Sequence, residues 1–174
     1  MLDRVIYLAH RLFWHYLMPC EKEARHLGVK IGESCLIATR KWSSEPYLIT
    51  IGNHVQITED VSFFTHGGGN CIRQHHPNFD VFGKIVIKDW AYIGARSCIM
   101  PGVTVGEGAL VAASSVVAKS VPPHMVVAGN PARIVCTTDE FYEKNKQFDM
   151  NKRLTGAAKK SFLLQLPDSK FIQK

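Results

Sequence analysis

The chain has 174 residues, about the length of one globular domain, and 46% of them are apolar. Every window of eighteen residues contains a charged side chain, which excludes a transmembrane helix. Much of the net charge of +6 lies beyond residue 143, without a nucleic-acid-binding motif or interleaved aromatic residues. This charge favours a site for an anionic cofactor over nucleic acid.

Residues 2–27 are predicted to form a helix, which makes 1–28 an N-terminal segment. Gly28 supplies its stop signal, and apolar side chains recur at helical spacing: Val5, Leu8, Leu12 and Tyr16. Other faces carry aromatic residues that suit packing against the rest of the protein or a neighbouring subunit, and peripheral membrane contact stays open. The N-terminal stretch is not typical of a signal peptide, because it contains Asp3 and Arg4 and has no small-residue cleavage site.

The cysteines are odd in number, scattered and without CxxC spacing: Cys20, Cys35, Cys71, Cys98 and Cys136. This pattern argues against a disulfide framework or a zinc knuckle. We therefore expect a reduced, cytoplasmic protein.

A six-residue period begins at Ile31, is interrupted at 43–47 and again at 67–84, and then runs unbroken from 87 to 122. Each of the last six hexads opens on a branched aliphatic residue: Ile87, Ile93, Ile99, Val105, Val111 and Val117. Each also has a small or β-branched residue in its fifth place: Ala91, Ser97, Val103, Ala109, Ser115 and Val121. A period of six fits neither an α-helix nor an alternating strand.

Three hexads make a coil of about eighteen residues with three flat faces, as in a solenoid that buries its apolar side by stacking. The opening aliphatics should form three internal ladders: Ile87 on Val105, Ile93 on Val111 and Ile99 on Val117. The fifth-place residues should also point inward. The predicted fold is mainly β, a parallel β-helix shaped as a triangular prism over 29–136, with an N-terminal helix and a C-terminal helical tail.

Segment 67–84 lacks the hexad pattern and is predicted to be an excursion loop from one corner of the prism. A long insertion in a compact repeat is usually functional. The segment from Pro123 to Val135 should close the tube as a final partial coil. Residues 137–174 are predicted to form the tail, with a helix over 139–154 and then a basic stretch.

Several short segments carry a resemblance: THGG before the loop, then DVFG, YIGA, VAKSVP and GNPAR. Over roughly 29–135 the sequence resembles the hexapeptide-repeat O-acetyltransferases, which include maltose, galactoside and nodulation acetyltransferases and those of bacterial polysaccharide synthesis. The resemblance implies a left-handed prism, a homotrimer and direct acetyl transfer from acetyl-CoA, with no metal. It also implies a sugar hydroxyl as acceptor, within surface polysaccharide biosynthesis.

His66 ends the last hexad before the loop, where the resemblance places the catalytic histidine. An alcohol that attacks a thioester must lose its proton, and imidazole accepts a proton near neutral pH. His66 is therefore the predicted general base. Acceptor binding is expected from one residue on the preceding coil and four in the loop: His54, Arg73, His75, His76 and Asp80.

The resemblance also places the cofactor, with small residues along the pantetheine arm and two cations near the phosphates. By motif match these residues are Ala95, Ala113, Ala118, Lys119 and Arg133. Lys119 and Arg133 can neutralise phosphate charge. Ala118 stands where relatives often carry Thr, so a side-chain contact there is in doubt.

Four alternatives stay open. An amino sugar acetylated on nitrogen would use the same base and donor. The four histidines of this region also fit a γ-carbonic-anhydrase-like zinc site between two subunits, although the C-terminal coils and the loop do not match that family. A prism with a basic groove can also be a non-catalytic scaffold. Covalent catalysis would fall to Cys71, whereas direct transfer needs only one base.

Overall fold

The computed structural model describes residues 6, 10 and 12–172. The chain divides into two units, Met1–Thr138 and Asp139–Lys174. This division lies close to the predicted boundary between 136 and 137.

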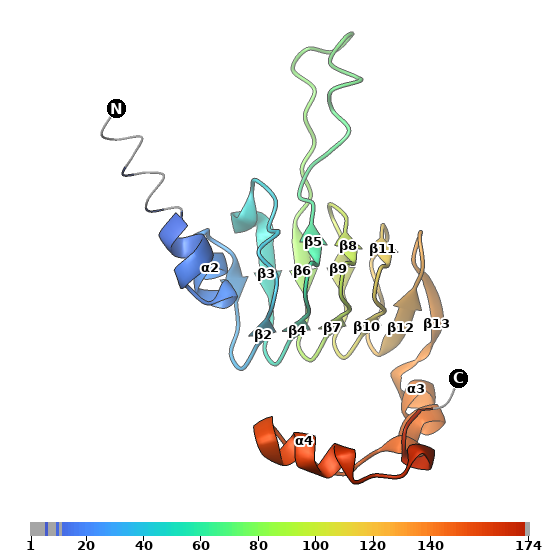
Figure 1. The fold of residues 1–174 in the computed structure, drawn as a ribbon. Helices are drawn as coiled ribbons and strands as arrows, with labels where there is room; N and C mark the ends of the chain where they lie inside the picture. The colour runs from blue at the N-terminus through green and yellow to red at the C-terminus, as the bar shows by residue number, and fades with distance from the viewer. Residues whose placement is uncertain (1–5, 7–9, 11, 173–174) are drawn as a thin grey trace. The chain divides into compact units, whose positions relative to one another are not determined.

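Short strands repeat along the first unit, and each full coil adds one strand to each of three sheets (Figure 1). The four-stranded sheet contains β1 (Lys30–Ile31), β3 (Ile49–Ile51), β6 (Ile85–Ile87) and β9 (Thr104–Val105). The three-stranded sheet contains β5 (Ser62–Phe63), β8 (Cys98–Ile99) and β11 (Val116–Val117). The six-stranded sheet contains β2 (Leu36–Ile37), β4 (Gln56–Ile57), β7 (Tyr92–Ile93), β10 (Leu110–Val111), β12 (Met125–Ala128) and β13 (Arg133–Thr137). The first unit is thus a parallel β-helix of the mainly β class.

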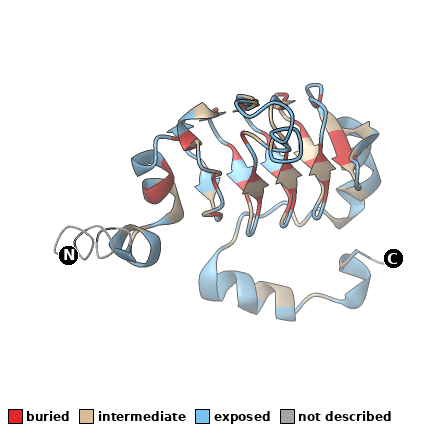
Figure 2. Cartoon of the chain, turned by 90° about the horizontal axis from the view of Figure 1, so that it is seen from above, coloured by how far each residue is buried: buried red, intermediate tan, exposed pale blue. Residues whose placement is uncertain are grey.

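The strand register confirms the three predicted ladders. The parallel pairs are Ile87 with Val105, Ile93 with Val111 and Ile99 with Val117. All six are buried, and so are the six small fifth-place residues (Figure 2). The buried Ser97 hydroxyl donates to the carbonyl of Ala112 at 2.9 Å, so this inward polar group is satisfied. Coils approach closely at the corners: a Cβ on Gly94 would lie 2.5 Å from the backbone nitrogen of Ala113.

The predicted N-terminal helix is interrupted. A short π-helical turn, η1 (Phe13–Leu17), is followed by α2 (Cys20–His26), because Pro19 has extended backbone and cannot continue a helical hydrogen-bond ladder. Residues 1–5, 7–9 and 11 of that prediction lie outside the described residues. Gly28 ends α2 as expected: its φ is +102°, and the amides of Gly28 and Val29 donate to Arg25 and Ala24 carbonyls.

Helix α2 covers the first coil of the prism. Ala24 is fully buried in the core. The guanidinium of Arg25 donates to the carbonyls of Ile31 and Gly32, which end strand β1. Glu23, also buried, pairs with Arg40 and with His15. The exposed start of the prism is therefore capped by packing and by charged hydrogen bonds.

Two irregular segments leave the coils on the same side. Residues 43–48, including the 3₁₀ turn η2 (Pro46–Leu48), lead into β3, and residues 64–84 connect β5 to β6. The second segment rises far above the strands as a long loop (Figure 1). The loop is closed at its base by an antiparallel bridge between His66 and Phe82. The Gly83 amide also donates to the backbone carbonyl of Thr65.

The prediction of a closing partial coil over 123–135 is only half correct. Strand β12 stacks parallel on β10, but the chain then reverses through Gly129 and a cis Asn130–Pro131 bond. Strand β13 consequently pairs antiparallel with β12. Gly129 has a φ of +100°, which permits this reversal.

The second unit differs from the predicted single helix over 139–154. Helix α3 (Thr138–Asn145) passes into a 3₁₀ turn, η3 (Lys146–Phe148), and stops there. The Asp149 carboxylate accepts from the amide of Asn151, a local turn that competes with helix. Helix α4 (Gly156–Leu164) and the 3₁₀ turn η4 (Asp168–Lys170) occupy the region expected to be a basic stretch. None of the described helices has the length and apolar character needed to cross a membrane.

Candidate active site

One edge of the prism gathers the irregular segments. It is the edge where the chain passes from the three-stranded sheet to the four-stranded sheet, and successive coils contribute residues 43–48, 64–84, 100–103 and 118–120 to it. His66 lies at this edge, immediately after β5 and at the base of the loop. The backbone before His66 is held by the pairing of β5 with β8, and the backbone after it enters the long loop.

His66 is paired with Glu45 from the preceding coil. The imidazole Nδ1 lies 2.7 Å from the Glu45 carboxylate Oε2, and the two side chains are 39% and 16% exposed. A carboxylate partner assigns the proton to Nδ1 and leaves Nε2 as the basic nitrogen. Nε2 has no hydrogen-bond partner among the described residues.

Glu45 is itself held by a buried hydroxyl. The hydroxyl of Thr65 donates to Oε2 of Glu45 at 2.6 Å, and Thr65 Oγ1 lies 2.8 Å from the hydroxyl oxygen of Ser43. The hydrogen bond from Thr65, aided by His66, lowers the pKa of Glu45 from its ordinary value of 4.5, against a smaller opposing effect of desolvation. Glu45 is therefore anionic at neutral pH and can stabilise a protonated imidazole.

A cavity of about 360 Å³ opens beside this pair. Its other lining residues come from the segment before β3 and from the loop: Ser44, Gly67, Gly68, Gly69, Asn70, Arg73, Asp80 and Phe82. Gly67 and Gly68 leave open space, since a Cβ on either would meet no atom within 4 Å. Phe82 supplies an aromatic wall, with its ring centroid 5.7 Å from that of His66. The cavity can hold a small polar molecule against the imidazole.

Comparisons with known proteins give the chain a family. It is 42% identical over 149 residues to Protein CapG of Staphylococcus aureus. The alignment covers 83% of this chain and 87% of CapG. The hexapeptide-repeat-containing acetyltransferase VCA0836 of Vibrio cholerae superposes with a TM-score of 0.56 at 28% identity, over 67% of this chain and 78% of that one. The chain belongs to the hexapeptide-repeat acetyltransferase family.

Two further matches bear on this hexapeptide-repeat protein. The putative acetyltransferase SACOL2570 of S. aureus is 35% identical over 114 residues, 64% of this chain and 56% of that protein, so the chain spans only part of that relative. VCA0836 has also been solved in complex with acetyl coenzyme A, with a TM-score of 0.55, 28% identity and coverage of 67% and 75%. No family model matches the chain. The fold is the left-handed β-helix of this family, as predicted.

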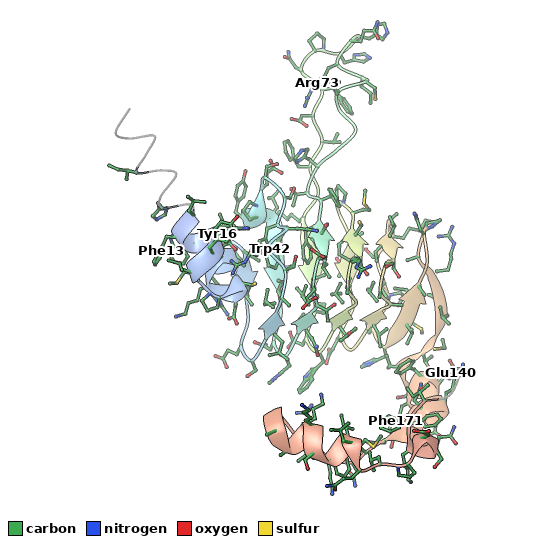
Figure 3. All side chains as sticks on the ribbon, viewed as in Figure 1. Phe13, Tyr16, Trp42, Arg73, Glu140 and Phe171 are labelled. Atoms are coloured by element: carbon green, nitrogen blue, oxygen red, sulfur yellow. The ribbon has the colours of Figure 1, made fainter. Side chains whose placement is uncertain are left out.

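The structure places only two of the predicted acceptor-binding residues in the His66 cavity. Arg73 and Asp80 both line it, and their side chains form an ion pair at 3.0 Å across the loop, where Figure 3 shows Arg73. His75 and His76 are exposed farther along the loop and are not part of the cavity wall. His54 lies at a different edge, where its ring stacks on Trp90 at 4.1 Å. The expectation that His54 shares the cleft of His66 is therefore wrong within one protomer.

Four of the five predicted cofactor-binding residues fall in two grooves of the hexapeptide-repeat prism. Ala95 and Ala113 lie on successive coils and line a groove of about 560 Å³ with residues of β2 and β4. Lys119 and Arg133 line a second groove of about 440 Å³ near the end of the prism. Ala118 is exposed and lines neither groove. One protomer thus brings these five residues together only in part.

The residue that sequence reasoning missed is Glu45. It lies in the interruption at 43–47, where the hexad pattern is broken and does not predict the position of a residue on the prism. The signal available was the interruption itself: a polar insertion one coil before His66, entering the same edge. Insertions at one corner of a repeat tend to meet in space.

The alternative sites gain no support from side-chain geometry. Cys71 is exposed, and its thiol lies 3.2 Å from the carbonyl of Gly68, outside the lining of the His66 cavity. Cys35 and Cys98 are half-buried within the coils. In the described part of one protomer, no three His, Cys, Asp or Glu side chains converge on a possible metal position.

Proposed function

We propose that the protein transfers an acetyl group from acetyl-CoA to a hydroxyl of a sugar, with His66 as general base. The observation that carries the proposal is the pairing of His66 with Glu45 at the wall of a polar cavity. A histidine held by a carboxylate is a common arrangement for accepting a proton from an attacking hydroxyl. Membership of an acetyltransferase family supplies the reaction class.

The reaction balances with one base. The acceptor hydroxyl gives its proton to Nε2 of His66 while its oxygen forms a bond to the thioester carbonyl carbon. The resulting imidazolium is stabilised by the Glu45 carboxylate, 2.7 Å from Nδ1. When the tetrahedral intermediate collapses, the carbon–sulfur bond breaks, and the leaving thiolate takes the proton back from His66. The products are an acetyl ester and free coenzyme A.

The polarity of the cavity supports a sugar acceptor. Asn70, Arg73 and Asp80 offer donors and acceptors to hydroxyl groups, and Phe82 can cover an apolar face of a sugar ring. We propose a precursor of a surface polysaccharide as the source of this sugar. An amino sugar acetylated on nitrogen is the runner-up, since the same base and donor would serve.

Acetyl-CoA as donor is supported by the complex of VCA0836 with acetyl coenzyme A. We propose that Ala95, Ala113 and Ala118 lie along its pantetheine arm and that Lys119 and Arg133 neutralise its phosphates. The groove that holds Ala95 and Ala113 and the groove that holds Lys119 and Arg133 are separate in one protomer. A homotrimer, in which a neighbouring subunit completes the cofactor site, would join them.

A reduced, cytoplasmic setting is proposed from the five free cysteines, which form no disulfide. Peripheral membrane contact through the N-terminal segment is also proposed. Its support is the exposure of Phe13, Tyr16 and Leu17 on the π-helical turn η1; Figure 3 labels the first two.

The deciding experiment is an acceptor screen with acetyl-CoA that measures release of free thiol. The panel should contain nucleotide sugars, oligosaccharides, amino sugars and non-sugar alcohols. His66→Ala should lower turnover of the best acceptor by about 10²–10⁴-fold. Full activity in this variant would assign the base elsewhere, and a panel in which only amines or non-sugar alcohols react would overturn the sugar-hydroxyl assignment.

A further inference from the structure

The second unit carries a strongly one-sided charge. From Met150 to Pro167 the chain has four cations, Lys152, Arg153, Lys159 and Lys160, and no acidic residue. The same stretch is rich in Leu and contains Phe162. None of its residues takes part in the reaction proposed above.

Three of these cations line one cavity. Lys152, Arg153 and Lys159 surround a hollow of about 360 Å³ between the segment before α4 and the first turns of that helix. No ion pair among the described residues involves any of the three. Lys152 instead sits over the ring of Phe162, with Nζ 4.7 Å from the ring centroid. Their mutual repulsion favours an anion in the hollow.

Part of the lining of the same cavity is apolar. Leu154, Phe162 and Leu163 line it, and all three are half-buried rather than enclosed. Thr155, at the start of α4, also lines the cavity, and its hydroxyl makes no capping hydrogen bond with the helix. One cavity therefore combines three cations and a hydroxyl with an aliphatic and aromatic surface.

We infer that this cavity binds the anionic phosphomonoester group of a lipid, whose long chain is apolar. Guanidinium, ammonium and hydroxyl groups are the donors that phosphate oxygens take. A carboxylate would need fewer donors, and a free phosphate would leave the apolar wall in water. A phosphorylated lipid satisfies both parts, with its headgroup among the cations and its chain along Phe162 and Leu163.

The test is co-sedimentation of the full chain with vesicles. Vesicles of phosphatidylcholine doped with phosphatidic acid should bind the protein, and vesicles of phosphatidylcholine alone should bind it far more weakly. The triple variant Lys152→Gln, Arg153→Gln, Lys159→Gln should lose on the order of 100-fold in affinity, because each cation near an anionic surface contributes roughly fivefold. Lys152→Arg with Lys159→Arg should retain binding.

A charge-matched control separates a built cavity from general attraction. Lys144→Gln, Lys146→Gln, Lys170→Gln removes the same charge from the same unit but leaves the cavity intact. This control should lose less than about fivefold. Equal losses in the two triple variants would overturn the inference. So would competition by soluble pyrophosphate that matches binding to the lipid, since the apolar chain would then contribute nothing.

Discussion

The two halves of the prism differ in how strictly they keep the repeat. In the later half, paired residues such as Ile93 and Val111 are eighteen apart in the chain. In the earlier half, Ile31 pairs with Ile51 and Phe63 pairs with Ile99, offsets of twenty and thirty-six residues. Both insertions enter at one edge, and they bring Glu45 and His66 together. The regular half supplies rigidity, whereas the interrupted half brings together the two residues that we propose for proton transfer.

Excision of the loop should separate these two properties most sharply. Removal of residues 67–84 joins His66 to Ile85 and restores an unbroken hexad, FFTHIV, before Ile87. We expect the variant to keep its β circular dichroism and a melting temperature within several degrees. Turnover should fall by roughly 10³-fold or more, because the acceptor cavity is lost while the base remains. An unfolded product would show that the prism depends on the loop, and retained activity would show that the loop does not form the acceptor site.

Truncation of a core side chain in the regular half should lower the stability of the prism, which loop excision should largely preserve. Ile93 is fully buried between Ile57 and Val111, so Ile93→Ala should cost about 2–5 kcal/mol in the free energy of unfolding. Chemical denaturation measures this loss. The neighbouring Tyr92→Ala, on the outer side of the same strand, should cost less than about 1 kcal/mol. Similar losses for both variants would contradict the inward assignment.

Substitution of Glu45, the residue of the interrupted half that the sequence did not predict, should have a moderate effect on turnover. Glu45→Gln should lower turnover by about 10²-fold, because the amide cannot stabilise the imidazolium and can hold the wrong tautomer. The KM for acetyl-CoA should not change. A merely structural role for Glu45 would lower the melting temperature but leave turnover and its pH dependence unaltered.

The depressed pKa of Glu45 also predicts a pH effect on stability. Since the folded value lies below 4.5, the contribution of this carboxylate is fully present above that pH. It is lost as the pH falls through the folded pKa. Glu45→Gln should therefore lose this contribution at neutral pH and flatten the acid limb of a stability–pH curve, while the slope of the curve near neutrality stays unchanged.

The smallest expected effect concerns the end of the regular half. Lys119→Ala and Arg133→Ala should each raise the KM for acetyl-CoA by up to about tenfold, since solvent screens an exposed charge pair. Turnover of both variants at saturating acetyl-CoA should stay unchanged. Steady-state kinetics with Lys88→Ala as a surface control would check both; unchanged KM values would place the phosphates elsewhere.

The sequence predicted what the period dictates. The ladders from Ile87 onward and the inward Ser97 follow from spacing alone, because each coil repeats the environment of the last. Glu45 could not be assigned, since its position depends on the course of an irregular segment rather than on a repeat. The antiparallel β13 was missed because Val135 and its neighbours continue an apolar pattern while the backbone reverses at Gly129.

The capping of both ends of the stack has a consequence for assembly. A parallel β-helix presents unpaired backbone groups at its first and last coils, and such edges template end-to-end growth into fibres. Here Arg25 occupies the carbonyls of Ile31 and Gly32 at one end. At the other end β13 runs antiparallel to β12, so on the six-stranded sheet an incoming first coil finds no parallel partner. The solenoid therefore resists polymerisation along its own axis, through the capped first coil at one end and through one reversed strand at the other.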